Sequence, residues 1–407
     1  MKYSFLILAV TLLSISCQQE QTLESEFTKG IQDSPKASTL TWMADSSLRV
    51  LDLHGSPYDR GFQHGQLLKQ DIRAVTDSLL IDIGKTTQMD AMQYIDSFLA
   101  QSDFTSALEK WTPELLEEIK GISAGSEIPY PIILMHQLGD EFFFSTKYMF
   151  AHKCSSIGVN HTDSHPTIAA QNMDIPTYFH GYQTVMKINE KDGREKLILT
   201  IPGHIGITGM NSSSISINCN ILMQLEAQSK GMPVSGIVRG TLNHTEYDQA
   251  LNWVKSIDHA SGQNYLIGGK EKVVSLECSA QSKEEFKPFA DAPFTYHTNY
   301  PVANKSYSDW YLSALDENGY TLKDMPQFCW RFPSFQKRFN QTTADFGIAE
   351  IKEVLSSRDH EKPDVVSNTY TYASVIYVLD DQPQFIIAPG KPHETEYINI
   401  PFPSQSL

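Results

Sequence analysis

The first third of the chain has the spacing of apolar and polar residues that is typical of helices. A short strand and turn precede the first helix, and Pro57 suits its first position. Gly61 and Gly65 lie four apart in that helix, so another element can approach its backbone closely. The predicted helices cover residues 58–83, 89–101, 105–122 and 131–150.

The pattern changes at Cys154. From there the apolar runs are short, rich in Val, Ile and Thr, and bounded by Gly, Pro and Asp, which is typical of strands. Predicted strands cover residues 155–159, 167–172, 183–189, 196–201, 205–209, 214–223, 264–268, 273–278, 295–299, 371–379 and 384–388. Helical patterns return at residues 233–242, 247–257 and 307–358. Strands, then helices, then strands again predict an α+β fold of two stacked antiparallel sheets with helices outside.

The N-terminus has the pattern of a secretion signal. One lysine is followed by an apolar stretch over residues 5–15, which is too short to span a bilayer. It ends at Ser16-Cys17, which resembles a bacterial lipoprotein processing site, so residues 1–17 are predicted to be a lipoprotein signal peptide and Cys17 the lipidated residue. The alternative is an ordinary secretory signal with an incidental cysteine. Residues 18–40, rich in Gln, Glu, Ser and Thr, then predict a flexible tether.

Composition limits the classes of function. The chain has 407 residues, and 32 Lys+Arg against 48 Asp+Glu give a net charge of −16, which argues against a nucleic-acid partner. Five cysteines, at positions 17, 154, 219, 278 and 329, include no C-x-x-C pair, so neither a zinc site nor a disulfide framework is expected. His152, His161 and His165 with Asp163 are irregularly spaced in a polar loop and are predicted to be surface residues. No metal and no cofactor are expected.

Cys154 is the strongest candidate for chemistry. Two serines follow it, and Asn172-Met173-Asp174 comes about twenty residues later. This combination predicts a nucleophile that is exposed when the peptide bond before it is cut. The new α-amine would have a pKa of about 7.7–8.0 and would serve as the base for its own thiol. A buried structural cysteine is one alternative. A papain-like pair with His161 is another, although the usual signature around such a cysteine is absent.

Five segments, in chain order, resemble the motifs of one family. They are residues 55–65 (GSPYDRGFQHG), Cys154-Ser155-Ser156, residues 171–174 (QNMD), residues 209–220 with Gly209-Met210-Asn211 and Asn218-Cys219-Asn220, and Tyr296-His297-Thr298-Asn299. The chain therefore resembles the acyl-coenzyme A:6-aminopenicillanate acyltransferase family of N-terminal-nucleophile (Ntn) hydrolases. The resemblance implies a four-layer αββα sandwich, self-cleavage before Cys154, and attack on a linear amide. The chain departs from the family at Lys153, where many relatives have a small residue.

The candidate site residues have distinct predicted roles. The Asp174 carboxylate suits pairing with the new ammonium group, or holding Cys154 during an acyl shift; the alternative is a turn residue at a strand end. The resemblance places Asn220 and Asn299 where their amides would stabilise developing negative charge. It also suggests Arg338 as an arginine near the nucleophile, with Arg331 as the other option.

These inferences predict a precursor enzyme. Residues 41–153 form a helical segment that self-cleavage releases as a separate chain, and residues 154–407 form the catalytic segment that folds with it as one domain. The predicted reaction is hydrolysis of a small acyl amide through a thioester on Cys154, because no basic cluster or glycine-rich loop suggests a coenzyme A phosphate site. The alternatives are transfer of an acyl group from acyl-coenzyme A to an amine, and a non-catalytic surface binding lipoprotein. The expected location is the bacterial cell envelope, with the lipid anchor as the sole membrane contact and the globular part outside the cytoplasm.

Overall fold

The computed structural model of the chain describes residues 37–147, 154–339, 346–359, 364–402 and 404. Three features of the sequence analysis lie outside these ranges: the signal peptide, its lipidation site at Cys17, and Lys153 before the predicted cut. Ser38–Leu407 form one unit. Among the described helices, none is both long enough and apolar enough to cross a bilayer.

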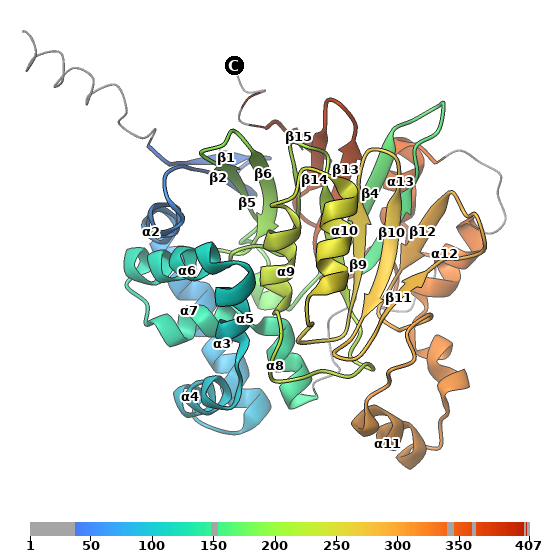
Figure 1. Cartoon of the computed structure of the whole chain (residues 1–407), viewed down its shortest axis with the longest axis horizontal. Helices are drawn as coiled ribbons and strands as arrows, with labels where there is room; N and C mark the ends of the chain where they lie inside the picture. Colours follow the sequence, from blue (N-terminus) through green and yellow to red (C-terminus); the bar gives the residue numbers. More distant parts are fainter. Residues whose placement is uncertain (1–36, 148–153, 340–345, 360–363, 403, 405–407) are drawn as a thin grey trace, which may run out of the picture. The chain divides into compact units, whose positions relative to one another are not determined.

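Helices fill most of the described chain before Cys154 (Figure 1). A capping box starts the first of them: Ser56 Oγ accepts from the Asp59 N–H at 3.2 Å, and Asp59 Oδ2 accepts from the Ser56 N–H at 3.0 Å. The predicted helix 58–83 is in fact two helices, because the chain turns at Leu68. The helices are α2 (Pro57–Leu67), α3 (Lys69–Thr87), α4 (Ala91–Gln101), α5 (Phe104–Trp111), α6 (Pro113–Ser126), α7 (Tyr130–Gln137) and α8 (Gly139–Thr146).

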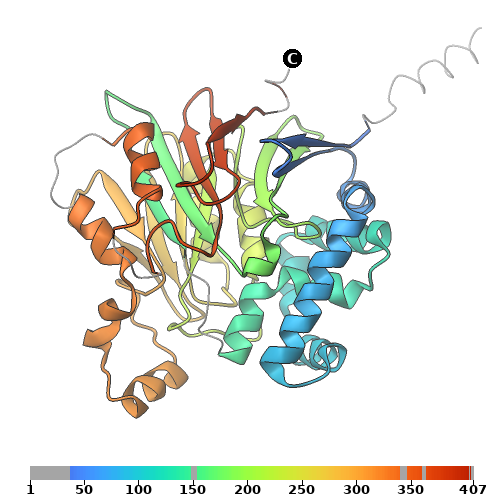
Figure 2. The ribbon, with the colours of Figure 1, turned by 180° about the vertical axis from the view of Figure 1, so that it is seen from behind.

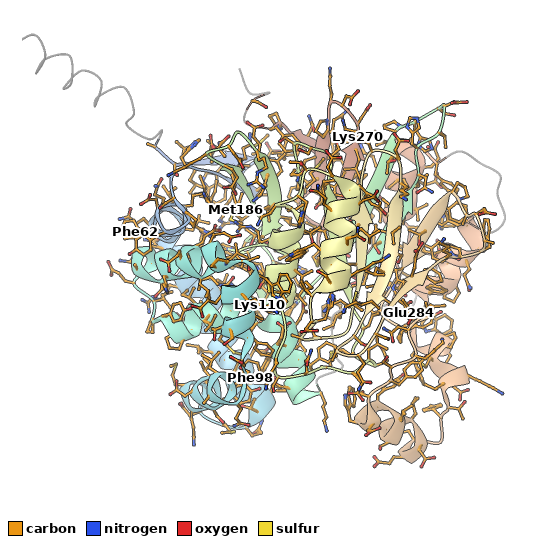
Figure 3. All side chains as sticks on the ribbon, viewed as in Figure 1. Phe62, Phe98, Lys110, Met186, Lys270 and Glu284 are labelled. Atoms are coloured by element: carbon orange, nitrogen blue, oxygen red, sulfur yellow. The ribbon has the colours of Figure 1, made fainter. Side chains whose placement is uncertain are left out.

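Helices α2 and α6 pack with their backbones in contact through glycines. A Cβ atom on Gly61 would lie 1.9 Å from the backbone oxygen of Glu118, and one on Gly125 would lie 2.0 Å from the backbone oxygen of Phe62. Phe62 marks α2 in Figure 3. The predicted close approach at Gly61 is therefore confirmed, and α6 is the element that makes it.

Two sheets form the centre of the unit, and neighbouring strands are antiparallel except for β2 and β5. The nine-stranded sheet contains, in spatial order, β1 (Thr39–Met43), β2 (Leu48–Leu53), β5 (Thr184–Asn189), β6 (Glu195–Thr200), β7 (Thr208–Asn211), β8 (Ser216–Ile221), β9 (Gln263–Gly268), β10 (Val273–Cys278) and β11 (Lys283–Phe286). The six-stranded sheet contains β12 (Phe294–His297), β3 (Ser155–Val159), β4 (Thr167–Asp174), β13 (Thr371–Leu379), β14 (Gln384–Ala388) and β15 (Ile398–Ile400). The sequence analysis missed β1, which begins inside the segment predicted as a tether and pairs with β2.

The two sheets stack face to face and helices cover both outer faces. Across the interface, Ser156 Oγ on β3 donates to Asn220 Oδ1 on β8 at 2.7 Å. Helices α9 (Val234–Thr241) and α10 (Tyr247–Ser256) pack on β8 and β9 of the larger sheet (Figure 1). The helices after β12 lie on the other side (Figure 2), where Tyr296 packs edge to face with Phe335 at a ring-centroid distance of 5.8 Å. They are α11 (Asp309–Glu317), α12 (Arg331–Phe339) and α13 (Ile348–Leu355). The described chain also contains two short 3-10 helices, η1 (Thr177–Phe179) before β5 and η2 (Leu322–Phe328) before α12. The predicted α+β class and the four-layer αββα arrangement are confirmed.

Candidate active site

Cys154 lies beside Asp174 because of the way in which β3 and β4 pair. The strands are antiparallel, with Ser155 opposite Asn172, so the start of β3 meets the end of β4. The Cys154 thiol lies 3.6 Å from Met173 Sδ and 3.9 Å from the backbone oxygen of Asp174. With an exposed fraction of 5%, the cysteine is nearly covered. Residues twenty apart in sequence are thus in contact at one end of the sheet.

Arg331, the first residue of α12, connects the nucleophile to Asn299. One Nη atom donates to the backbone oxygen of Cys154 and, at 3.1 Å, to Ser155 Oγ. The other Nη atom donates to Asn299 Oδ1 at 3.0 Å. Its Nε donates to Asp364 Oδ1 at 2.8 Å, and this ion pair is buried. The planar guanidinium fork suits such a role, because it holds several acceptors in one fixed geometry.

The choice of Arg338 as the arginine near the nucleophile was wrong. Arg338 donates to Asp359 Oδ1 at 2.5 Å, and its side chain is partly exposed. Both arginines lie on α12, and a helix rises by about 1.5 Å per residue, so Arg338 lies about 10 Å further along the axis than Arg331. Arg331, kept as the other option, is the one that contacts Cys154.

The Asp174 carboxyl is buried, and only one of its two oxygens has a hydrogen-bond partner that can be identified among the described residues. Asn368 Nδ2 donates to Asp174 Oδ2 at 2.5 Å, while Asp174 Oδ1 has no hydrogen-bond partner among the described residues. Burial raises the pKa of Asp174 to about 7, although the nearby Arg331 lowers it.

Asn368 is a site residue that the sequence analysis missed. It lies 194 positions after Asp174, in the turn before β13, and reaches the carboxyl because Thr371 on β13 pairs with Asp174 on β4. A lone asparagine in a turn has no local pattern that distinguishes it from other turn residues. Only the strand register could have identified it.

The Cys154 thiol is protonated in this environment. Burial raises its pKa to about 12 and the Asp174 charge adds to the effect, while the backbone of Asp174 and Arg331 oppose it. A thiol of that pKa is a poor nucleophile at neutral pH until a base removes its proton. The described contacts of Cys154 include no histidine. This geometry favours a base that is created at the cysteine itself.

The two candidate asparagines have different environments. Asn299 is held from both ends of its amide: Oδ1 accepts from Arg331, and Nδ2 donates to the backbone oxygen of Ile221 at 3.0 Å. Asn220 lies between the sheets, where its Oδ1 accepts from Ser156 Oγ at 2.7 Å and from Asn264 Nδ2 at 3.0 Å. Neither Asn220 nor Asn299 is among the described residues that line the cavity at Cys154, and Asn220 Nδ2 has no hydrogen-bond partner among the described residues. The role of both amides in stabilising negative charge stays a prediction.

Cys154 opens into a cavity of about 110 Å³ that both halves of the chain line. Helices α3, α7 and α8, which precede Cys154, contribute a large part of the wall. Most of the lining is apolar, including Leu79, Phe142, Phe143, Cys154, Ile175, Phe179, Ile201, Ile207 and Cys219. An apolar, concave wall with few polar groups is typical of sites for small organic ligands.

The histidines singled out in the sequence do not form a metal site within the described ranges. His165 Nδ1 bonds the backbone oxygen of Pro166 at 2.8 Å. Across the described residues, no cluster of three or more His, Cys, Asp or Glu side chains is placed to hold a metal ion.

Comparisons with known proteins agree with the family resemblance. Residues 160–323 match the family model described as acyl-coenzyme A:6-aminopenicillanic acid acyl-transferase. The chain is 23% identical to the acyl-coenzyme A:6-aminopenicillanic-acid-acyltransferase 40 kDa form of Emericella nidulans over 269 residues, which cover 65% of this chain and 72% of that protein. Both matches agree with the predicted resemblance to this family.

Two further proteins are similar to this chain. An uncharacterized protein of Archaeoglobus fulgidus is 22% identical over 250 residues, covering 55% of this chain and 42% of that protein. The chain thus spans less than half the length of that relative. Among solved structures, a variant of conjugated bile acid hydrolase from Clostridium perfringens is similar with a TM-score of 0.40 and 12% identity, covering 62% of this chain and 94% of that one.

Proposed function

We propose that this chain is a self-processing cysteine Ntn hydrolase that cuts itself before Cys154 and then cleaves linear amides. The observation that carries the proposal is the set of contacts around Arg331. They join the Cys154 carbonyl to Asn299, and the backbone oxygen of Asp174 lies 3.9 Å from the Cys154 thiol. The match to an acyltransferase family supports the same class of chemistry.

Processing would proceed by an acyl shift from nitrogen to sulfur. Cys154 Sγ attacks the carbonyl carbon of Lys153, the bond from that carbon to the Cys154 nitrogen breaks, and the thiol proton passes to the nitrogen. Water then hydrolyses the thioester, which restores the thiol and releases the carboxyl group of Lys153. Asp174 supports these steps, since burial raises the pKa of its carboxyl to about 7 and its backbone oxygen lies 3.9 Å from the Cys154 thiol.

Turnover would use the α-amine that processing creates. The amine takes the proton of its own thiol, and the thiolate attacks the substrate carbonyl carbon. Asn299 Nδ2 has two N–H groups and donates one to Ile221, so the second is available to the developing oxyanion, a contact worth about 3 kcal/mol. The ammonium group returns its proton to the leaving amine, and water resolves the acyl-thioester.

The two fragments would stay together after the cut. Glu118, before Cys154, and Arg239, after it, form a buried pair with two hydrogen bonds of 2.6 and 2.9 Å. Arg60 lies 3.6 Å from the same carboxylate. Separating the fragments would leave these buried charges without partners, which costs about 3–5 kcal/mol for one such pair.

Intact-mass spectrometry of the purified protein tests processing. The wild type is expected as two chains, one ending at Lys153 and one beginning at Cys154, whereas Cys154→Ala is expected as a single chain. Cys219→Ala is the matched control, because Cys219 is also a buried thiol in the cavity wall. Cleavage that continues in Cys154→Ala, or that occurs at another bond, contradicts the proposal.

The same measurement separates hydrolysis from transfer. The protein is incubated with N-acyl amides, and separately with an acyl-coenzyme A donor and an acceptor amine, while acylation of Cys154 is followed by mass. Hydrolysis predicts acid product from the amide and a transient acyl-enzyme. An amide product formed solely from the thioester donor would favour the acyltransferase alternative, and the absence of turnover and acylation would favour a binding protein.

A lipid anchor at Cys17 is part of the proposal. Lipidation would hold the protein at the cell envelope with residues 38–407 outside the cytoplasm. The support is the apolar stretch that ends at Ser16-Cys17.

A further inference from the structure

The cavity at Cys154 has a polar group of side chains in its otherwise apolar wall. Asp140 on α8, Ser235 on α9 and Gln263 on β9 all line it. Gln263 is fully buried, and neither its Oε1 nor its Nε2 has a hydrogen-bond partner among the described residues. Ser235 is 3% exposed, and its Oγ also has no partner there. Buried polar atoms without partners are rare in folded proteins, so these atoms indicate a ligand.

Glu141 holds the three elements of this group together. Its Oε1 accepts from the Val234 N–H at 3.1 Å and from Ser261 Oγ at 3.1 Å. Val234 is next to Ser235, and Ser261 is two residues before Gln263. The positions of the unpartnered side chains are therefore determined by a buried carboxyl group behind them.

Among the described residues, no lysine or arginine balances the acidic side chain of this group. None of the described residues that line the cavity is a lysine or an arginine. Among the described residues, the Asp140 carboxyl has neither a hydrogen bond nor an ion pair. Together with Ser235 and Gln263, it gives this part of the wall one acidic group and several neutral oxygens, which favours a cation and disfavours an anion.

We propose that Asp140, Ser235 and Gln263 form a subsite for a primary ammonium group at the end of the substrate's acyl chain. The inference rests on the proposed hydrolase function and names its substrate class: amides whose acyl part is an apolar chain with a terminal amine.

The acceptors of this group match this ligand. A primary ammonium has three N–H donors and no acceptor. Asp140, Ser235 Oγ and Gln263 Oε1 supply three acceptors. Burial raises the pKa of Asp140 to about 7, and a bound ammonium would favour its carboxylate form. A carboxylate ligand would be repelled by Asp140, and a methyl group would leave the polar atoms of Gln263 buried and unsatisfied, at about 1–3 kcal/mol for each group.

The acyl side of the substrate is the better occupant. The acyl group stays bound to Cys154 as a thioester after the amine has left, so a subsite at a fixed distance from the sulfur can keep its contacts with the end of the acyl chain. The rest of the wall includes Phe142, Phe143 and Ile207, which suit a hydrocarbon chain.

Three para-nitroanilides of matched length test the charge preference: ω-aminohexanoyl, heptanoyl and adipoyl. We expect kcat/KM for the ω-aminohexanoyl substrate to exceed that for heptanoyl about tenfold or more, and adipoyl to be the poorest. A fourth substrate, a hexanoyl amide of a diamine, places the ammonium on the leaving side. Equal rates for the first two substrates, or preference for the fourth, would overturn the subsite.

Variants of the subsite residues test which side chains produce the preference for a terminal ammonium group. Asp140→Asn is expected to reduce the ratio of kcat/KM for ω-aminohexanoyl over heptanoyl about tenfold, and the exposed control Asp316→Asn should leave that ratio unchanged. If Asp140→Asn fails to fold, as judged by self-cleavage and thermal unfolding, Ser235→Ala and Gln263→Leu replace it. A preference that persists in all folded variants contradicts the subsite. Cleavage of none of the substrates, with no acylation of Cys154, would instead refute the proposed function itself.

Discussion

Replacing Arg331 by lysine tests the central contact of the proposed site. The guanidinium donates to four acceptors: the Cys154 carbonyl, Ser155 Oγ, Asn299 Oδ1 and Asp364 Oδ1. Lysine keeps the positive charge, so Asp364 retains a partner of opposite sign. Its ammonium is a single point on a flexible stem and cannot hold the Cys154 carbonyl and Asn299 in one plane.

The expected cost comes from the hydrogen bonds that a lysine cannot make. Without the bonds to the Cys154 carbonyl and to Asn299, at about 1.5 kcal/mol for each charge-assisted bond, the transition state for self-cleavage is destabilised by about 3 kcal/mol. That corresponds to a rate reduction of about 10²-fold. The fold should survive, because the buried carboxylate of Asp364 keeps a positively charged partner.

The assay follows the disappearance of the uncut chain after synthesis, by gel densitometry or intact mass. Arg338→Lys is the matched control, because Arg338 lies on the same helix and pairs with Asp359 at the surface. Thermal unfolding reports whether each variant is folded. Near wild-type cleavage in a folded Arg331→Lys protein, or equal slowing in Arg338→Lys, would show that the reasoning about Arg331 is wrong.

Three further predictions concern pH, packing and location. The pKa of Asp174 is about 7 in the folded protein and 3.8 for the free side chain, so the unfolded chain loses this proton first as pH rises. In a Cys154→Ala background, the free energy of unfolding of the protein with Asp174, relative to that of its Asp174→Asn variant, should therefore fall between pH 4 and pH 7. Urea midpoints whose difference stays constant over this range would contradict the raised pKa. Gly61→Ala should lower the free energy of unfolding by about 1–3 kcal/mol, because its Cβ would overlap the α6 backbone. Gly84→Ala, with its nearest neighbour 3.5 Å away, should cost nothing or stabilise α3 by up to about 1 kcal/mol, and denaturant melts compare the two. Cys17→Ser should move the protein from the membrane fraction to the released fraction on ultracentrifugation without loss of self-cleavage; a wild type found entirely in the released fraction would refute the anchor.

Local patterns in the sequence were sufficient to predict most of the elements and to single out Cys154 as a candidate. Apolar spacing identified the helical first third, and the change to short β-branched runs located the strands from Cys154 onward, because both signals depend on residues close in sequence. The pair Gly61 and Gly65 indicated a close helix contact for the same reason. Cys154 and Asp174 could be paired in advance, since they flank two strands that are neighbours along the chain.

The partners of those residues depended on contacts between distant segments. The family resemblance favoured Arg338 over Arg331, but the position of the start of α12 relative to β3 decides which arginine reaches the Cys154 carbonyl. Asn368 reaches Asp174 through the register of β13 on β4. Asn220 was assigned from its motif, and the stacking of the two sheets places its Oδ1 against Ser156 Oγ. Each outcome was set by packing between segments far apart in the chain, and local propensity carries no information about such packing.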